Sequence, residues 1–206
     1  MALTERKSAI IDMAMRLIAE NGLANFAMKQ ISTRLHINEA LIYRDFSTRE
    51  NLLTMCMSSY EKDMHTMLNT IDVASVHDMD SFLRVFKDGW NSFVSFLITE
   101  DYRTIFYVEY ATTPTNRGSK ENQRSPLAFI NRELSEVCTI ETMEESPEPG
   151  KTLIDYVLFG MTLTYVKGVI LDGYKDSEVA RDMLWDLLLH SLSHIITIKF
   201  YEDEQG

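Results

Sequence analysis

Histidines and nearby carboxylates are the residues in this chain whose chemistry could serve a metal ion or an enzyme. His190 and His194 are four residues apart, so on a helix they would share one face and could hold a metal ion. Neither has a convincing third ligand nearby in sequence, and a surface or interface role explains them better. His77, Asp78 and Asp80 precede a predicted helix, where capping explains the aspartates. We therefore predict no metal, no cofactor and no catalytic residue, which argues against an enzyme.

Cysteine usage and hydropathy place the chain among reduced proteins without a membrane span. Cys56 and Cys138 are the two cysteines of the 206 residues, and they belong to no CxxC pair or Cys/His cluster. The N-terminal stretch lacks the apolar core of a secretory signal. No apolar run approaches the roughly 18 residues of a membrane helix. We expect a cytoplasmic protein.

The negative charge is distributed unevenly along the chain. The net charge is −11, yet residues 1–53 hold seven basic and six acidic side chains. The remainder holds 13 basic and 25 acidic side chains. A nearly neutral N-terminal head on an acidic body is compatible with nucleic-acid binding by the head, but does not establish it.

The spacing of apolar residues and the positions of proline and capping residues predict a chain built of helices. All four prolines lie between positions 114 and 149, and long proline-free segments flank them. Helical spacing of apolar residues predicts helices over about 4–21, 28–35 and 39–46, with Asn38 as the N-cap of the third. The turn over 36–38 makes the second and third a helix-turn-helix, whose third helix enters the DNA major groove.

The rest of the chain predicts a larger helical body. Helices are expected from about 52 to 70, from 78 or 80 onward, over 102–111, from Ser125-Pro126, over 151–171 and over 177–200. No alternating strand pattern stands out. The predicted fold is all-α with about nine helices, divided into a head over 1–53 and a body over 54–206.

The head also resembles a known family. Gly22-Leu23, Ile37-Asn38, the run 41–46 (LIYRDF) and the run 49–53 (RENLL) resemble the N-terminal signature of tetracycline-repressor-type (TetR family) regulators. The resemblance covers about residues 5–53. It implies a ligand-responsive transcriptional regulator, most often a repressor, that binds a palindromic operator as a homodimer.

The resemblance also implies roles for individual residues of the head. Tyr43 matches a tyrosine that touches the DNA backbone, and Arg49 matches a basic residue that attracts phosphate at a helix N-terminus. Lys29 matches a position that contacts bases or phosphates. The exposed face of the recognition helix would carry Glu39, Ala40, Leu41 and Arg44.

Departures from the family pattern affect the expected affinity and operator. Ala27 stands where a Ser or Thr cap is usual, and His36 replaces the usual turn glycine, so His36 must adopt a left-handed conformation. Glu39 and Leu41 replace common Lys, Arg, Thr or Ser. Glu39 could accept a hydrogen bond from cytosine N4, or it could simply favour the helix N-terminus.

For the body, the resemblance implies an effector pocket, and aromatic and soft side chains could line it. An ordinary hydrophobic core is an equally good explanation for each of them. The candidate residues are Trp90, Phe93, Phe106, Tyr107, Tyr110, Tyr156, Met161 and Tyr165. The implied effector is an apolar or aromatic small molecule.

Small residues every four positions suggest a dimer interface in the last two predicted helices, although packing within one subunit is the alternative. Small side chains let helices approach closely, and apolar residues on the final helix would complete a four-helix contact between two subunits. The candidate interface residues are Gly160, Thr164, Gly168, Leu184, Leu188, Ser191 and Ile195.

The sequence thus favours a homodimeric repressor, and two other classes stay open. The chain could act mainly through protein–protein contacts, with Glu39 and Asp45 weakening its hold on DNA. It could also be a metabolite-binding protein or an enzyme that carries the motif without using it.

Overall fold

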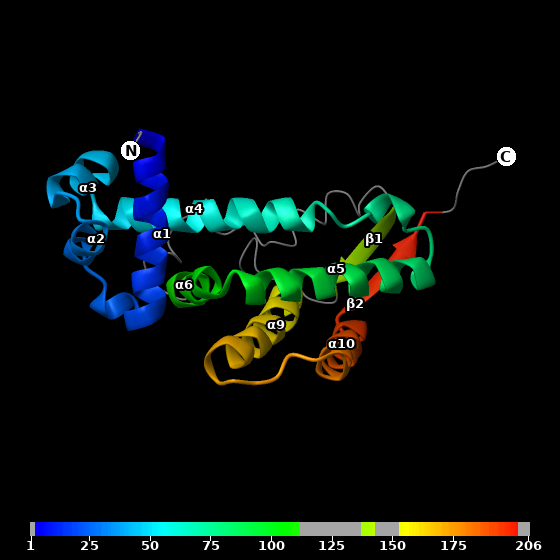
Figure 1. The fold of residues 1–206 in the computed structure, drawn as a ribbon. Helices are drawn as coiled ribbons and strands as arrows, with labels where there is room; N and C mark the ends of the chain where they lie inside the picture. Colours follow the sequence, from blue (N-terminus) through cyan, green and yellow to red (C-terminus); the bar gives the residue numbers. More distant parts are fainter. Residues whose placement is uncertain (1–2, 112–136, 143–152, 202–206) are drawn as a thin grey trace. The chain divides into compact units, whose positions relative to one another are not determined.

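The computed structural model describes residues 3–111, 137–142 and 153–201. Eight α-helices and one two-stranded sheet account for most of this part of the chain (Figure 1). The mostly helical architecture predicted from the sequence is confirmed. The helix predicted from Ser125-Pro126 lies outside the described residues.

The chain packs into two compact units. The first contains Met1–Met64 and the segment that begins at Glu100, and the second contains His65–Thr99 and the rest of the described chain. The helix over 101–111 therefore packs with the head, although the sequence assigned it to the body. The elements of the first unit are α1 (Leu3–Asn21), the 3-10 turn η1 (Leu23–Asn25), α2 (Met28–Leu35), α3 (Glu39–Phe46), most of α4 (Arg49–Leu68) and α6 (Asp101–Ala111).

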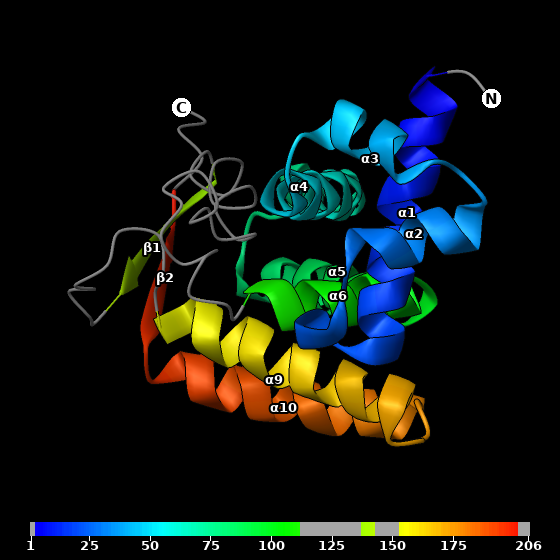
Figure 2. The ribbon, with the colours of Figure 1, turned by 90° about the vertical axis from the view of Figure 1, so that its left-hand side faces the viewer.

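The first unit is organised around α1. Its apolar side chains at Ile10, Ala14 and Ile18 are fully buried, and they recur at the spacing of one helix face. Side chains from α2, α3, α4 and α6 meet them in one hydrophobic core. Figure 2 shows α2 and α3 beside α1, as the helix-turn-helix prediction requires. The ends of α2 and α3 coincide with those predicted from the sequence.

The second unit contains η2 (Val73–Ser75), α5 (Met79–Thr99), α9 (Leu153–Leu171) and α10 (Glu178–Ser193). α9 and α10 run side by side (Figure 2). The Trp90 indole donates to the Thr162 hydroxyl at 2.9 Å and lies against the Trp185 ring. Arg181 of α10 donates to the Asn91 carbonyl of α5 at 2.9 Å. Aromatic contact and one arginine thus connect three helices.

Two short strands depart from the purely helical prediction. β1 (Cys138–Thr142) pairs antiparallel with β2 (Ile196–Phe200), and Ile140 is the register partner of Ile198. The sequence analysis extended the last helix to Phe200, which is wrong, because α10 ends at Ser193. Ile196, Thr197, Ile198, Lys199 and Phe200 alternate between half-buried and exposed. Such alternation in β-branched and aromatic residues favours a strand, and the helical periodicity before it masked the signal.

Gly168 lies under the Tyr174 ring of its own chain, near the end of α9. A Cβ at this position would lie 2.4 Å from the Tyr174 ring of the same chain. The Tyr174 amide donates to the Gly168 carbonyl at 3.1 Å, and Gly173 between them has φ 71°. The chain therefore folds back over Gly168 where α9 ends.

Gly168→Ala is expected to leave the stability of the protein close to that of the wild type, because displacement of the Tyr174 ring offsets the roughly 1 kcal/mol that alanine gains over glycine inside a helix. Thermal unfolding followed by circular dichroism measures the effect. Lys167→Ala, at the neighbouring exposed position, is the control and should stay within about 0.5 kcal/mol of the wild type. A Gly168→Ala protein about 1 kcal/mol more stable than the wild type would show that the turn yields without cost.

Candidate nucleic-acid interface

The recognition helix α3 divides its side chains between the core and solvent. Ile42 is fully buried and Phe46 is 2% exposed, whereas Tyr43 is 46% exposed. The Arg44 side chain is 62% exposed. Ala40 is also exposed, and Glu39 and Leu41 are half-buried. On the face predicted to meet DNA, Ala40, Tyr43 and Arg44 are therefore exposed to solvent. Glu39 and Leu41 are only partly exposed.

Local hydrogen bonds fix the turn that precedes α3. The Asn38 side chain accepts from the Ala40 amide at 2.9 Å, so Asn38 caps the helix as predicted. His36 has φ 53° and ψ 42°, which confirms the left-handed conformation expected of the residue that replaces glycine. The Ile37 amide donates to the Ser32 carbonyl at 3.1 Å. These bonds set the angle between α2 and α3.

A glutamine compensates for the missing cap of α2. Ala27 has no side chain that could accept a hydrogen bond, but its own amide donates to the Gln30 Oε1 at 2.9 Å. This bond is half of a capping box. Lys29, in the first turn of α2, is exposed, as a DNA contact requires. The start of α2 is thus held from within the helix.

Arg49 has structural partners in addition to its predicted phosphate role. Its Nη2 donates to the Leu23 carbonyl at 2.9 Å, and its guanidinium lies 5.4 Å from the centre of the Phe26 ring. The Leu23 amide in turn donates to Glu109 of α6 at 3.2 Å. Arg49 therefore joins α4 to the turn after α1, and only its remaining N–H groups are available to a phosphate.

Thr48 caps α4. Its hydroxyl accepts from the Asn51 amide at 3.0 Å. The preceding Ser47 has φ 63°, an unfavourable region for a side chain other than glycine, and its amide donates to the Tyr43 carbonyl at 2.7 Å. Two residues, the strained Ser47 and the capping Thr48, thus separate α3 from α4.

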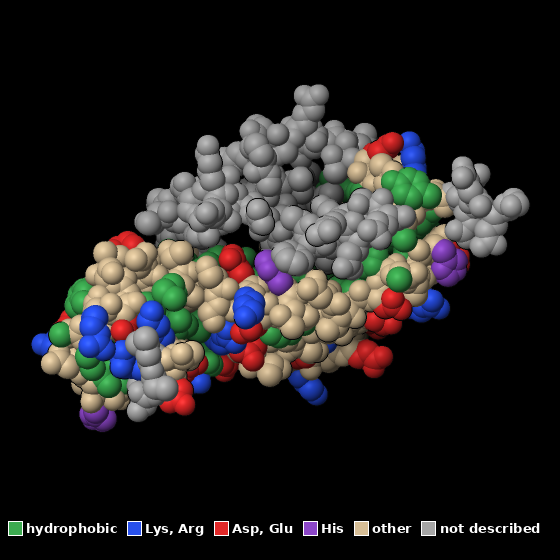
Figure 3. All heavy atoms as spheres, turned by 90° about the horizontal axis from the view of Figure 1, so that it is seen from above, with side chains coloured by type: hydrophobic (Ala, Val, Ile, Leu, Met, Phe, Trp, Pro, Cys, Tyr) green, Lys and Arg blue, Asp and Glu red, His purple; other side chains and the backbone are tan. Residues whose placement is uncertain are grey.

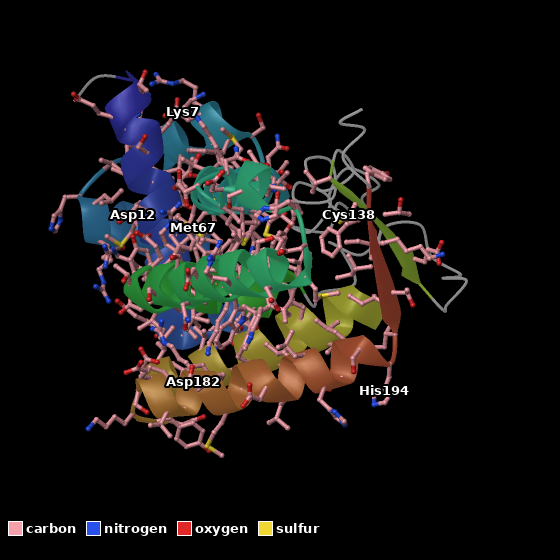
Figure 4. All side chains as sticks on the ribbon, turned by 90° about the vertical axis from the view of Figure 1, so that its right-hand side faces the viewer. Lys7, Asp12, Met67, Cys138, Asp182 and His194 are labelled. Carbon is pink, nitrogen blue, oxygen red and sulfur yellow. The ribbon has the colours of Figure 1, made fainter. Side chains whose placement is uncertain are left out.

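Asp45 of α3 is paired with Arg6 of α1. Nε of Arg6 donates to Oδ2 of Asp45 at 2.8 Å, and Nη2 donates to Oδ1 at 3.0 Å. The Asp45 side chain is 4% exposed and that of Arg6 is 14% exposed. The hydrogen bond from Arg6 holds the pKa of the Asp45 carboxyl below its usual range, aided by the charges of Arg6, Arg44 and Lys7. Lys7, labelled in Figure 4, lies beside Arg6 on α1.

The surface of the head is the more basic part of the face seen in Figure 3. Lysine and arginine side chains gather there over the N-terminal helices, whereas acidic side chains are frequent along the rest of that face. Such a distribution favours contact of the head with a polyanion.

Comparisons with known proteins agree with this geometry. Residues 10–55 match the family model described as bacterial regulatory proteins of the tetR family. The N-terminal part of this chain is therefore similar to tetR-family regulators. None of the curated proteins matches it in sequence.

Solved structures share the fold of this chain at low sequence identity. A protein from Shewanella sp. PV-4 assigned to the tetR family is 15% identical and has a TM-score of 0.68, covering 93% of this chain and 98% of its own. A TetR family transcription regulator from Marinobacter aquaeolei VT8 is 12% identical with a TM-score of 0.66, covering 92% and 95%. A TetR-like regulator from Rhodococcus sp. RHA1 is 16% identical with a TM-score of 0.66, covering 94% and 98%.

The aromatic residues proposed for an effector pocket belong to two different units. Phe106 and Tyr110 are buried in the core of the head with α1, and Tyr107 packs against that core. The other candidates belong to the second unit, where the Phe93 ring contacts that of Phe159 and the Tyr165 hydroxyl donates to Asp176 at 2.7 Å. Trp90 pairs with Trp185, Met161 is half-buried, and the side chain of Tyr156 lies outside the described residues. Core packing thus accounts for Phe106 and Tyr110.

The residues proposed for the dimer interface also differ in burial: some are exposed and others are buried within the subunit. Gly160 and Thr164 are exposed on α9, whereas Gly168 and Leu188 are buried inside the subunit. Leu184 and Ser191 are half-buried on α10, and Ile195 lies in the turn beyond that helix. Gly168 and Leu188 are therefore covered by residues of their own chain.

A different apolar stripe is exposed on α10. Val179, Met183 and Leu187 are 69%, 64% and 56% exposed, and they are spaced by four residues. Asp182 and His194, labelled in Figure 4, lie toward opposite ends of this helix. The sequence analysis considered Leu187 for the interface but did not separate this stripe from the buried side, because α10 is apolar on more than one side and only burial distinguishes the sides.

The residues singled out for metal or redox chemistry have ordinary surroundings. The His190 and His194 rings lie 5.0 Å apart, edge to face. Among the described residues, no three His, Cys, Asp or Glu side chains come together as metal ligands. Cys56 and Cys138 are buried, and burial raises the pKa of both thiols. Within the described chain, no helix is both long and apolar enough to cross a bilayer.

Tyr43→Ala is expected to weaken binding to any DNA duplex and to leave stability within about 0.5 kcal/mol of the wild type, because this side chain is exposed. The adjacent Ile42→Ala should instead lower stability by about 2–5 kcal/mol, since it leaves a cavity in the head core. Chemical unfolding and fluorescence anisotropy with a labelled duplex measure the two effects. Loss of stability in Tyr43→Ala would contradict the division of α3 into a core face and a DNA face.

Proposed function

We propose that this regulator is a homodimeric repressor that binds a palindromic operator and is released by a small-molecule effector in the cytoplasm. The observation that carries the proposal is the capped helix-turn-helix, whose α3 exposes Tyr43 and Arg44 beside the exposed Lys29 of α2. Tyr43, Lys29 and the free donors of Arg49 would hold phosphates. Arg44, with Glu39, Ala40 and Leu41, would meet base edges in the major groove.

The apolar stripe of α10 supports a dimer. A stripe of large, exposed apolar side chains along one face of a helix is a feature of protein interfaces. A second copy would cover Val179, Met183 and Leu187 with the same residues, because a two-fold contact is self-complementary. The exposed Gly160 and Thr164 of α9 would extend the contact. Two heads would then read half-sites about 34–36 Å apart.

An effector would act by favouring a conformation in which the two heads no longer match that spacing. Trp90, Phe93 and Met161, on α5 and α9, supply the apolar and aromatic surface of the second unit that suits such a ligand. We therefore propose an apolar or aromatic effector that binds within this unit.

One of the two observations that favoured a protein acting mainly through protein–protein contacts, the acidic Asp45, no longer supports that alternative. It rested on acidic residues in the recognition helix, but the Asp45 carboxylate is neutralised by Arg6 and faces away from solvent. Glu39 alone remains half-buried near the DNA face.

Selection from a pool of randomised 30-base-pair duplexes tests the proposed function. The wild-type protein is expected to enrich an inverted repeat whose half-sites are separated by about one helical turn. Enrichment of duplexes without a shared sequence would contradict operator recognition. Enrichment of a single half-site would contradict the dimeric arrangement.

Leu187→Glu is expected to convert the dimer to monomers, because a charge placed in a buried interface loses its hydration. Sedimentation velocity measures the change. Ser193→Glu adds the same charge to the same helix away from the stripe, so it should remain dimeric. A dimeric Leu187→Glu protein would place the interface on another surface.

A further inference from the structure

The Arg6–Asp45 pair is the best-defined polar contact between α1 and the recognition helix. Two parallel N–H···O bonds of 2.8 and 3.0 Å join the planar guanidinium to the planar carboxylate. Such a pair restrains both the distance and the relative orientation of the two groups, which a single ion pair does not. The Asp45 carboxylate also lies 3.8 Å from the Arg44 Nε on its other side.

The location of this pair in α3 matters for DNA recognition. α3 has eight residues, or about two turns, and its apolar contacts to the core come from Ile42 and Phe46. Apolar contacts are not directional. They therefore hold α3 against the core more firmly than they restrain small rotations of α3 about its own axis. The pair acts at the last turn of α3, next to the exposed Arg44, and attaches that turn to the first turns of α1. A nearby contact is Lys7, whose Nζ lies 6.0 Å from the Phe46 ring centre.

Neither member of the pair is free to read DNA. Both carboxylate oxygens of Asp45 accept from Arg6, and the two side chains are 4% and 14% exposed. We propose that Arg6 and Asp45 are positioning residues for operator recognition, which set the rotation of α3 and thus the angle at which Arg44 and its neighbours meet the bases. This inference rests on the proposed function, because it presupposes an operator.

The test uses the full-length protein, the duplex enriched by the wild type, and a scrambled duplex of the same composition. Arg6→Lys keeps the charge but removes the two-bond geometry, and Asp45→Asn keeps the shape but removes the charge. Each is expected to lower the ratio of operator to scrambled affinity on the order of tenfold. Binding to the scrambled duplex and the dependence of affinity on salt should match the wild type, because no phosphate contact is lost.

A double-mutant cycle identifies the contact itself. If the two residues act through each other, the double variant Arg6→Lys/Asp45→Asn should have the same ratio of operator to scrambled affinity as the more affected single variant. Arg16→Ala is the matched control, since Arg16 lies on the same helix and pairs with Asp12 in an exposed contact of 2.9 Å. This control should keep the wild-type ratio. Thermal unfolding confirms that each variant is folded at the assay temperature, and Asp45→Asn, which retains the size of the side chain, provides the test if Arg6→Lys does not fold.

Three results would overturn the inference. The inference fails if the variants keep the wild-type ratio, if the two losses multiply in the double variant, or if Arg6→Lys and Asp45→Asn weaken binding to both duplexes by the same factor. The last result would mean that the pair supports general DNA affinity and not the orientation of α3 toward the bases. A wild-type protein that enriches no inverted repeat would instead refute the proposed function, and this inference with it.

Discussion

Burial of the apolar face of α1 is the constraint on which the rest of the head depends. α2 and α3 have eight residues each, which is too short for a stable helix in water without tertiary contacts. Ile31 of α2 and Ile42 of α3 are fully buried in the core that α1 organises. The position of the DNA-facing side chains is therefore a consequence of hydrophobic packing on the opposite side of the same helices. A substitution in that core would affect DNA binding without touching DNA.

The same core includes α6. Phe106 is fully buried and Tyr110 is 4% exposed in the cluster that contains Ile10 and Ile18 of α1. Glu109 accepts from the Leu23 amide, and Leu23 in turn accepts from Arg49. A helix distant in sequence thus supports both the core and the turn of the head. Any ligand that changes the position of α6 would act on the DNA-binding unit through direct contacts.

Polar contacts add orientation to a fold whose stability comes from apolar burial. Asn38 and Thr48 fix the helix ends by accepting from backbone amides, and Arg49 holds the Leu23 carbonyl. Each such bond contributes modestly to stability, but each is directional. Charge alone is a poor guide to function in this protein. Asp45 counts against DNA binding in the sequence, whereas in the structure its pairing with Arg6 leaves little negative charge facing solvent.

Local sequence patterns predicted the helical class, the bounds of α2 and α3, the left-handed residue at His36 and the similarity of the head to the tetR family. These features depend on local periodicity, caps and backbone preferences, which neighbouring residues specify. The predicted contacts to DNA, effector and partner remain predictions, although burial already places Phe106 and Gly168 within the packing of one chain. The pairing of Arg6 with Asp45 and of Glu109 with Leu23 follows from long-range packing, because these partners are 39 and 86 residues apart. Only the tertiary structure distinguished the exposed stripe of α10 from its buried side. Pairing across such separations, and the choice between two apolar faces, depend on how the helices pack, and no local pattern records that.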